Sequence, residues 1–229
     1  MLNVLGRGFL ERVLDPVGRR LARAGVSPDA ITVAGMVGVV ASSVLFTARG
    51  HLLLALIGIT LSALTDMLDG AVARALGRAS RWGAFLDSTL DRVADAAIFG
   101  CLAYWLLRED RPGAGAAALV CLAAGALVSY AKARAEGLGL TCNVGIAERG
   151  ERLALVGVGG FLEILDVPYA IDVVLWVLAG LTVVTIGQRM WTVRVQTRGE
   201  RARPGAAESA DLRPPPGPPG PGVDGSAQP

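Results

Sequence analysis

Six apolar runs that contain no charged residue are the feature that most constrains how this chain can fold. They cover residues 31–48, 52–65, 96–107, 113–131, 153–162 and 173–187. A helix needs about 20 apolar residues to cross the hydrocarbon core of a bilayer. Two runs approach that length, and the other four reach it only if their helices continue into charged residues. The sequence therefore predicts an all-α integral membrane protein with six transmembrane helices, several of which carry polar groups at one end.

The composition excludes an ordinary soluble domain. Only 18% of the 229 residues are charged, and the mean hydropathy is +0.50, whereas soluble domains average about 25% charged residues. The net charge of +2 does not indicate a nucleic-acid partner. The three cysteines, Cys101, Cys121 and Cys142, have neither metal-ligand spacing nor the pattern of a disulfide framework, so we expect them to pack as small apolar side chains.

The basic residues predict the orientation of the spans. If both termini are cytoplasmic, only Arg49, Arg108 and Arg111 of the 22 lysines and arginines lie on the outer side. An excess of basic residues in cytoplasmic segments is the usual arrangement in membrane proteins. The sequence therefore predicts that both termini are cytoplasmic, and that the basic residues there can contact anionic membrane lipids.

The two ends of the chain differ from the apolar middle. Residues 1–25 are amphipathic and interrupted by arginines, which favours an interfacial helix on the inner leaflet over a cleavable signal peptide. The last 34 residues hold eight of the twelve prolines and almost no large apolar residues, so they cannot bury a core. We therefore expect a membrane domain over residues 1–195 and a disordered cytoplasmic tail over residues 196–229; the alternative for the tail is a proline-rich ligand for a partner domain.

Two pairs of aspartates interrupt the apolar pattern. Asp66 and Asp69 are three residues apart and Asp87 and Asp91 are four apart, so each pair shares one face of a helix. A tight loop joins the two helices, which makes them antiparallel neighbours with their acidic faces opposed. Four carboxylates in one place repel one another unless cations balance them, and hard oxygen ligands suit Mg²⁺ or Mn²⁺. The spacing predicts two divalent ions, which is a common arrangement for phosphoryl chemistry.

Small residues and one arginine accompany the aspartates. Gly70, Ala73 and Gly83 lie close to the acidic faces and would let a flat ligand approach the backbone, while Arg74 can donate a forked pair of hydrogen bonds to a phosphate. Asp95 continues the second acidic face by another turn and receives no role. Two alternatives stay open at this point: the aspartates form interfacial salt bridges, or they form the ion site of a cation transporter or channel.

The complete spacing resembles a known family signature. From Asp66 to Asp91 it is Asp-x2-Asp-Gly-x2-Ala-Arg-x8-Gly-x3-Asp-x3-Asp, and it matches the CDP-alcohol phosphotransferases at all eight positions. That family joins a CDP-linked lipid to an alcohol with release of CMP, has six spans and is usually a homodimer. The resemblance implies that Asp66, Asp69 and Asp87 bind metal and that Asp91 binds the second metal and acts as the general base.

The same resemblance implies a set of contacts to the CDP-lipid. The nine residues are Asp29, Ala30, Ile31, Thr32, Gly70, Ala73, Arg74, Ser80 and Gly83. The first four would complete the nucleotide pocket, the small residues would face the cytidine, and Arg74 and Ser80 would contact the lipid substrate.

A cationic cluster indicates the kind of acceptor alcohol. Lys132, Arg134, Arg149 and Arg152 lie on the cytoplasmic side, where the aspartates are also predicted. A neutral acceptor needs no such cluster, whereas a phosphomonoester carries nearly two negative charges. A purely anchoring role of these residues, with neighbouring glutamates as partners, is the alternative.

The segments that carry the cluster resemble a subgroup of the family. Residues 129–136 and 148–153 are similar to the segments that flank the inositol phosphate pocket of actinobacterial phosphatidylinositol phosphate synthases. The resemblance implies transfer from CDP-diacylglycerol to 1D-myo-inositol 3-phosphate (inositol 1-phosphate), at the cytoplasmic face of a bacterial inner membrane. The alternative within the family is phosphatidylglycerophosphate synthesis, with glycerol 3-phosphate as acceptor.

Overall fold

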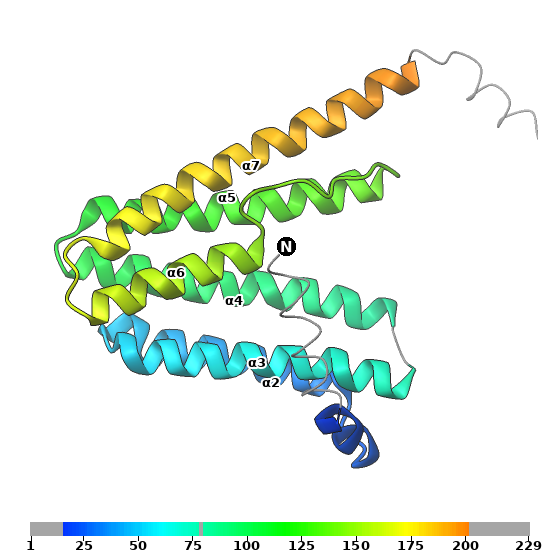
Figure 1. Ribbon diagram of the computed structural model, residues 1–229, viewed down its shortest axis with the longest axis horizontal. Helices are drawn as coiled ribbons and strands as arrows, with labels where there is room; N and C mark the ends of the chain where they lie inside the picture. The colour runs from blue at the N-terminus through cyan, green and yellow to red at the C-terminus, as the bar shows by residue number, and fades with distance from the viewer. Residues whose placement is uncertain (1–15, 78–79, 202–229) are drawn as a thin grey trace, which may run out of the picture.

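The computed structural model describes residues 16–77 and 80–201, except for the side chains of Asp66, Met67 and residues 199–201. Over these residues the chain forms helices joined by turns and loops, without a strand (Figure 1). The elements are α2 (Pro28–Leu45), the 3-10 helix η1 (Thr47–Arg49), α3 (Leu52–Leu76), α4 (Arg81–Arg108), α5 (Pro112–Gly137), α6 (Arg149–Ile164) and α7 (Ala170–Arg201).

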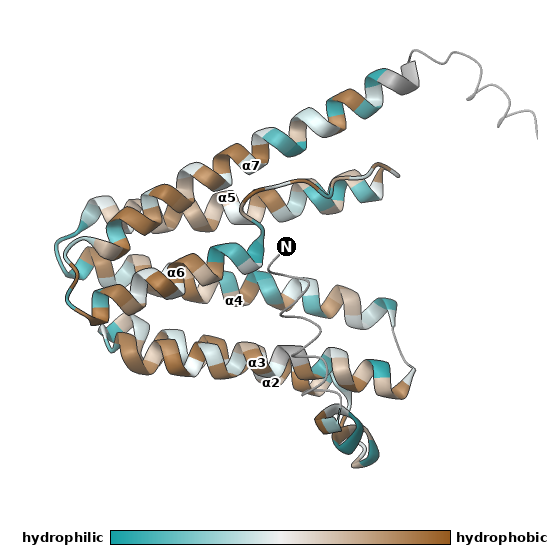
Figure 2. Cartoon of the chain, viewed as in Figure 1, coloured by the Kyte–Doolittle hydropathy of each residue, from teal (hydrophilic) through white to brown (hydrophobic). Residues whose placement is uncertain are grey.

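Four helices are long and apolar enough to cross a bilayer. They span Pro28–Arg49, Leu52–Leu76, Pro112–Gly137 and Ala170–Arg198, which confirms an all-α, multi-pass membrane protein. Of the six predicted spans, these four are candidates by length and composition. α4 has 28 residues but carries several charges in its first half, and α6 has 16 residues, or about 24 Å of helix. Figure 2 shows hydrophilic residues along the first half of α4 and at the start of α6.

α2 and α3 form a tight antiparallel pair because small residues face each other between them. A Cβ atom added at Gly38 would collide with the Ser62 hydroxyl, and one added at Gly58 would collide with the Ser42 hydroxyl. The helices therefore approach as closely as their glycines allow, a mode of packing that is common between membrane helices. This approach holds α2 against the first half of α3, which precedes the half that carries Asp69.

Replacing Gly58 with valine is expected to separate α2 from α3. The added side chain has no room beside Ser42, and overpacking of this kind costs about 1–3 kcal/mol of stability. Thermal unfolding followed by the loss of helical circular dichroism should show a lower midpoint for this variant. Gly180→Val on α7 is the matched control, since no atom lies within 4 Å of a Cβ added there. Equal midpoints for the two variants would contradict the packing argument.

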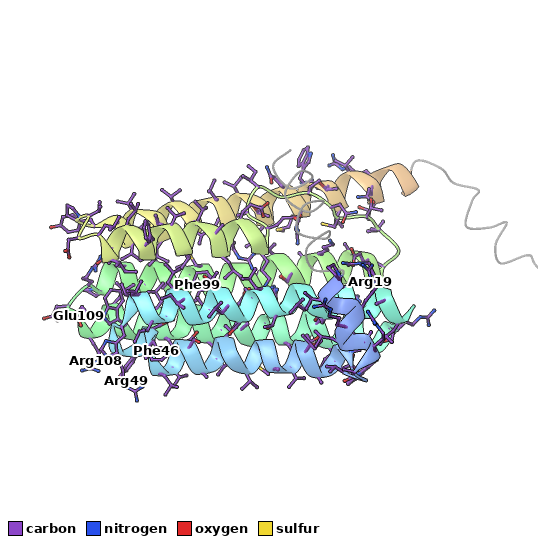
Figure 3. The ribbon with its side chains drawn as sticks, turned by 60° about the horizontal axis from the view of Figure 1, so that its bottom comes forward. Arg19, Phe46, Arg49, Phe99, Arg108 and Glu109 are labelled. Carbon is purple, nitrogen blue, oxygen red and sulfur yellow. The ribbon has the colours of Figure 1, made fainter. Side chains whose placement is uncertain are left out.

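The main core lies between α4, α5 and α7. Its large buried side chains come from α4 and α7 and include Phe99, Leu106, Leu175 and Leu178, whereas α5 contributes small residues such as Ala117 and Cys121. Cys121 and Cys142 are buried and all three cysteines are free thiols, as the sequence predicted. Figure 3 shows Phe99 in the interior of the bundle, between the ends marked by Arg19 and Glu109.

An ion cluster closes one end of this core. Arg111, which precedes α5, binds both Glu163 at the end of α6 and Asp172 at the start of α7. Burial alone would lower the pKa of Arg111, but the hydrogen bonds to Asp172 and Glu163 raise it above its ordinary value. The guanidinium therefore stays charged and ties three chain segments together at this end.

Charged residues mark both ends of the bundle. Arg49, Arg108 and Glu109 lie together at one end of the molecule, and Arg19 lies at the opposite end (Figure 3). The helical segment 16–23 contacts α3, where Gly18 packs directly against Ala71. Residues 1–15 of the predicted interfacial helix lie outside the described residues.

The predicted boundary between domain and tail falls inside a helix. α7 continues to Arg201, and the Gln196 side chain accepts a hydrogen bond of 3.0 Å from the Thr141 amide and donates one to the Thr141 carbonyl. Residues 196–201, which the sequence assigned to a disordered tail, are therefore helical, and Gln196 at their start contacts the loop after α5. The remainder of the predicted tail, residues 202–229, lies outside the described residues.

Candidate active site

A cavity of about 390 Å³ opens where the start of α2, the second half of α3 and the start of α4 meet. Six of the nine residues predicted to contact a CDP-lipid lie in its wall. They are Asp29, Thr32, Gly70, Ala73, Ser80 and Gly83. The structure thus brings together residues that are up to 54 positions apart in the sequence.

Three predicted contacts lie elsewhere. Ala30 and Ile31 are absent from the wall of this cavity. Among the predicted residues 29–32, only Asp29 and Thr32 line it. Arg74 lines a separate hollow together with Arg19, beneath the helical segment 16–23. Helical periodicity explains why Ala30 and Ile31 turn away from the cavity. Arg74, by contrast, shares a helix face with Gly70, and its Nη1 would lie 3.4 Å from a Cβ atom added at Gly70.

Two helix N-termini border the cavity, each with its own cap. The Ser27 hydroxyl accepts a hydrogen bond from the Ala30 amide at 3.2 Å, and the Ser80 hydroxyl accepts one from the Gly83 amide at 2.8 Å. Serine is a favoured N-cap residue, and amide groups at helix N-termini favour bound anions such as phosphate. Ser27 was not predicted as a site residue, although Ser-Pro before an apolar run is a recognisable helix start.

Asp69 and Asp87 bring two carboxylates to the same cavity wall. The Thr32 hydroxyl donates a hydrogen bond of 2.5 Å to Asp69 Oδ2, which fixes α2 against α3 at the site. Asp87 and Asp29 lie close enough to Asp69 for their negative charges to repel it. Oxygen donors with an excess of negative charge fit a hard divalent cation.

The full set of four carboxylates stays a prediction. The side chain of Asp66 lies outside the described residues, and among the described side chains no three potential metal ligands lie close enough together to hold an ion. Asp91 lines an adjoining narrower pocket of about 50 Å³, and Thr32 lines both. The two cavities therefore meet at Thr32, with Asp87 facing one and Asp91 facing the other.

Asp91 is paired with one of the predicted acceptor-binding arginines. Arg149 Nη1 lies 2.7 Å from Asp91 Oδ1, and both side chains line the narrower pocket. The loop before α6 and the first turn of α6 therefore approach the middle of α4. The sequence placed these two residues on the same side of the membrane but did not predict their contact.

The four predicted acceptor-binding residues divide into two groups. Lys132 and Arg134 lie near the end of α5, where Arg134 is exposed and the Lys132 ammonium is 3.9 Å from Glu136. Arg149 lies at the narrower pocket. Arg152 is only 1% exposed and binds Asp95, so a soluble acceptor does not reach it in this structure. Its burial corrects the expectation of four converging cations, because the buried Asp95 holds Arg152 behind the pocket.

The loop between α5 and α6 is anchored by residues that the sequence did not single out. Arg189 on α7 is 3% exposed and donates hydrogen bonds to the carbonyls of Val144, at 2.9 Å, and Val128. The Thr185 hydroxyl accepts a hydrogen bond of 3.1 Å from the Ala147 amide. These contacts fix the loop that leads into Arg149. An arginine late in an apolar helix was the available signal for this role.

The chain matches the family model for CDP-alcohol phosphatidyltransferases over residues 25–186. It is 46% identical to a phosphatidylinositol phosphate synthase of Streptomyces avermitilis, over 92% of this chain and 89% of the relative. It is 41% identical to the enzyme of that name from Corynebacterium glutamicum, over 83% of this chain and 88% of the relative.

Solved structures give the same result. The crystal structure of Mycobacterium tuberculosis phosphatidylinositol phosphate synthase with CDP-DAG bound superposes with a TM-score of 0.75 at 39% identity, covering 80% of this chain and 94% of that one. A second structure of that enzyme, in complex with manganese and citrate, also has a TM-score of 0.75 at 39% identity, covering 79% and 88%. The chain therefore belongs to the CDP-alcohol phosphatidyltransferase family.

Proposed function

We propose that this protein is a phosphatidylinositol phosphate synthase, which transfers the phosphatidyl group of CDP-diacylglycerol to 1D-myo-inositol 3-phosphate and releases CMP. The observation that carries the proposal is the cavity in which the family motif on α3 and α4 meets the start of α2. The relatives that bear this name cover most of both chains. The M. tuberculosis enzyme of that name has been crystallised with CDP-DAG.

The proposed cofactor is a pair of Mg²⁺ or Mn²⁺ ions. Asp69 and Asp87, which share the cavity wall, would be ligands together with Asp66 and Asp91. The crystal structure of the M. tuberculosis relative with manganese supports this choice. When bound, such ions stabilise the negative charge of a diphosphate and of the CMP that leaves.

The residues of the chain divide the remaining work. Gly70, Ala73 and Gly83 leave space for the cytidine, and the capped starts of α2 and α4 offer amide groups to the phosphates. Asp91 accepts the proton of the acceptor hydroxyl. The acceptor oxygen then bonds to the phosphorus on the lipid side of the diphosphate, and the bond from that phosphorus to CMP breaks.

Positive charge beside Asp91 supports a phosphorylated acceptor. Arg149 lies against Asp91, and Lys132 and Arg134 supply further positive charge near the end of α5. Glycerol 3-phosphate shares the phosphomonoester, so phosphatidylglycerophosphate synthesis is the second candidate. The names of the relatives favour inositol phosphate.

The membrane arrangement follows from the same proposal. We infer that α4 and α6 cross the bilayer with α2, α3, α5 and α7, which gives six spans preceded by the interfacial helix. Both termini and the site would face the cytoplasm of a bacterial cell, since the site lies at the end opposite to Arg49 and Arg108. A homodimer is the proposed assembly, by similarity to the family.

One assay tests the proposal and both of its alternatives. Purified protein is supplied with CDP-diacylglycerol, Mg²⁺ and either labelled inositol phosphate or glycerol 3-phosphate, and CMP and labelled lipid are measured. We expect CMP release and labelled lipid with inositol phosphate. Turnover with glycerol 3-phosphate but not with inositol phosphate would show that glycerol 3-phosphate is the acceptor. Absence of CMP release with both acceptors would reject an enzyme and favour a cation transporter that uses the aspartates.

A further inference from the structure

Asp95 lies at the centre of a charge network that the family motif does not include. It is one turn beyond Asp91 on α4 and is 5% exposed. Its two oxygens contact two arginines of α6: Oδ1 is 3.3 Å from Arg149 Nε, and Oδ2 is 2.9 Å from Arg152 Nη2. Burial removes water from this carboxylate, and that cost is offset only because its charge is paired and both of its oxygens have partners.

Arg149 connects Asp95 to the proposed general base. The Nε side of its guanidinium binds Asp95, and Nη1 binds Asp91 at 2.7 Å. Arginine makes such a double contact because its donors form a rigid, planar fork. Arg149 is therefore shared between a half-buried carboxylate at the pocket and a fully buried one behind it.

The buried side of the network is fixed to two other helices. Arg152 binds Asp95 and packs against Gly125 of α5, where an added Cβ would lie 3.2 Å from its guanidinium carbon. Arg92 lies 3.8 Å from Asp95 and donates to the Ser129 hydroxyl on α5. Asp95 is thus held by α5 and α6, whereas the side chain of Asp91 is 20% exposed at the pocket, where Arg92 also lies 3.8 Å from it.

The charges of the network favour an anion at its exposed side. Three guanidinium groups, those of Arg92, Arg149 and Arg152, face two carboxylates, which leaves an excess of one positive charge. Asp91 has to turn away from Arg149 in order to meet a hydroxyl. Without Asp95 as a second partner, the Arg149 side chain would move with Asp91 and remain paired with it.

We propose that Asp95 is a positioning residue that retains Arg149 beside the pocket, so that Asp91 is released for the acceptor hydroxyl and Arg149 meets the acceptor phosphate. This inference rests on the proposed function. It assigns Asp95 no contact with substrate: Asp95 acts through Arg149, and Arg152 holds Asp95 in place.

A double-mutant cycle on the purified full chain tests this role. Asp95→Asn is expected to raise the KM for inositol phosphate at least tenfold and to leave the KM for CDP-diacylglycerol within twofold. Arg149→Lys keeps the positive charge but loses the fork. If Asp95 acts through Arg149, then adding Asp95→Asn to Arg149→Lys should change the acceptor KM by less than twofold. The same tenfold change in both backgrounds would overturn the proposal, as would an unchanged acceptor KM in Asp95→Asn.

Two further variants keep the test interpretable. Asp172→Asn is the matched control, since Asp172 is a partly buried acid paired with Arg111 at the opposite end of the bundle; it should lower the midpoint of thermal unfolding and leave both KM values unchanged. If Asp95→Asn does not fold, Asp95→Glu, which keeps the charge and moves it by one methylene, enters the same cycle with the same criteria.

The outcome separates this inference from the proposed function. If the wild-type enzyme uses glycerol 3-phosphate instead of inositol phosphate, only the acceptor assignment is wrong. The double-mutant cycle is then measured with glycerol 3-phosphate. If the wild type is active but the two substitutions show no coupling, only the positioning role of Asp95 is wrong. If the wild type releases no CMP with either acceptor, both the proposed function and the positioning role are wrong.

Discussion

Asp91→Asn is expected to lower kcat by about 10²- to 10⁴-fold, the contribution that general-base catalysis usually makes, while CDP-diacylglycerol still binds. The amide of asparagine has nearly the same shape as the carboxylate but cannot accept the proton of the acceptor hydroxyl. Asp91 lines the narrower pocket, and the cavity proposed for the nucleotide is lined by Asp69 and Asp87 instead. Binding of the CDP-lipid should therefore be retained.

Steady-state kinetics and lipid-binding measurements distinguish this outcome from general damage. Asp110→Asn is a suitable control, since Asp110 is exposed on the turn between α4 and α5 and adopts a positive φ of 54°, which asparagine tolerates. The control should behave as wild type. More than a tenth of wild-type kcat in Asp91→Asn would contradict the base role.

Removal of divalent metal is expected to abolish turnover completely, and added Mg²⁺ or Mn²⁺ to restore it. Asp29, Asp69 and Asp87 share one cavity wall, and a bound cation relieves their mutual repulsion. Ligand binding to the folded state also raises stability, by about 2.7 kcal/mol when the ligand concentration is 100 times Kd. Mn²⁺ should therefore raise the unfolding midpoint as well as the activity.

Asp87→Asn connects both effects to the site. This variant loses one ligand charge, so the increase in unfolding midpoint with Mn²⁺ should be smaller than in wild type. Asp172→Asn, whose carboxylate binds Arg111 instead, should keep the full increase. Turnover that persists in excess chelator, or an equal increase in all three proteins, would exclude the proposed metal centre.

Local spacing was enough to predict much of the site. Asp69, Gly70, Ala73, Gly83 and Asp87 follow helical periodicity on two neighbouring helices, and a short connection leaves those helices few ways to pack other than side by side. The resemblance to a family then added Asp29, Thr32 and Ser80, all of which lie in the cavity wall. Thr32 is 37 positions from Asp69, and spacing alone does not predict a contact over that separation.

The cationic cluster shows where such prediction fails. Arg149 and Arg152 are three residues apart and share a face of α6, so the sequence grouped them with Lys132 and Arg134 as equals. The structure separates them by burial, because Asp95 draws Arg152 into the interior and leaves Arg149 at the pocket. Partner choice among several like charges depends on distances between helices, which the sequence does not contain.

The sequence by itself determined the class of the protein and the chemistry of its central motif. Apolar runs of 18 and 19 residues without a charge indicate membrane spans, and the helical spacing of the aspartates predicts two acidic faces. Only the tertiary structure decided the role available to Asp95 and the separation of Asp87 and Asp91 between two adjoining cavities. The physical reason is that helix periodicity fixes directions within one helix, whereas contacts such as Thr32 with Asp69 or Arg149 with Asp91 depend on how separate helices pack.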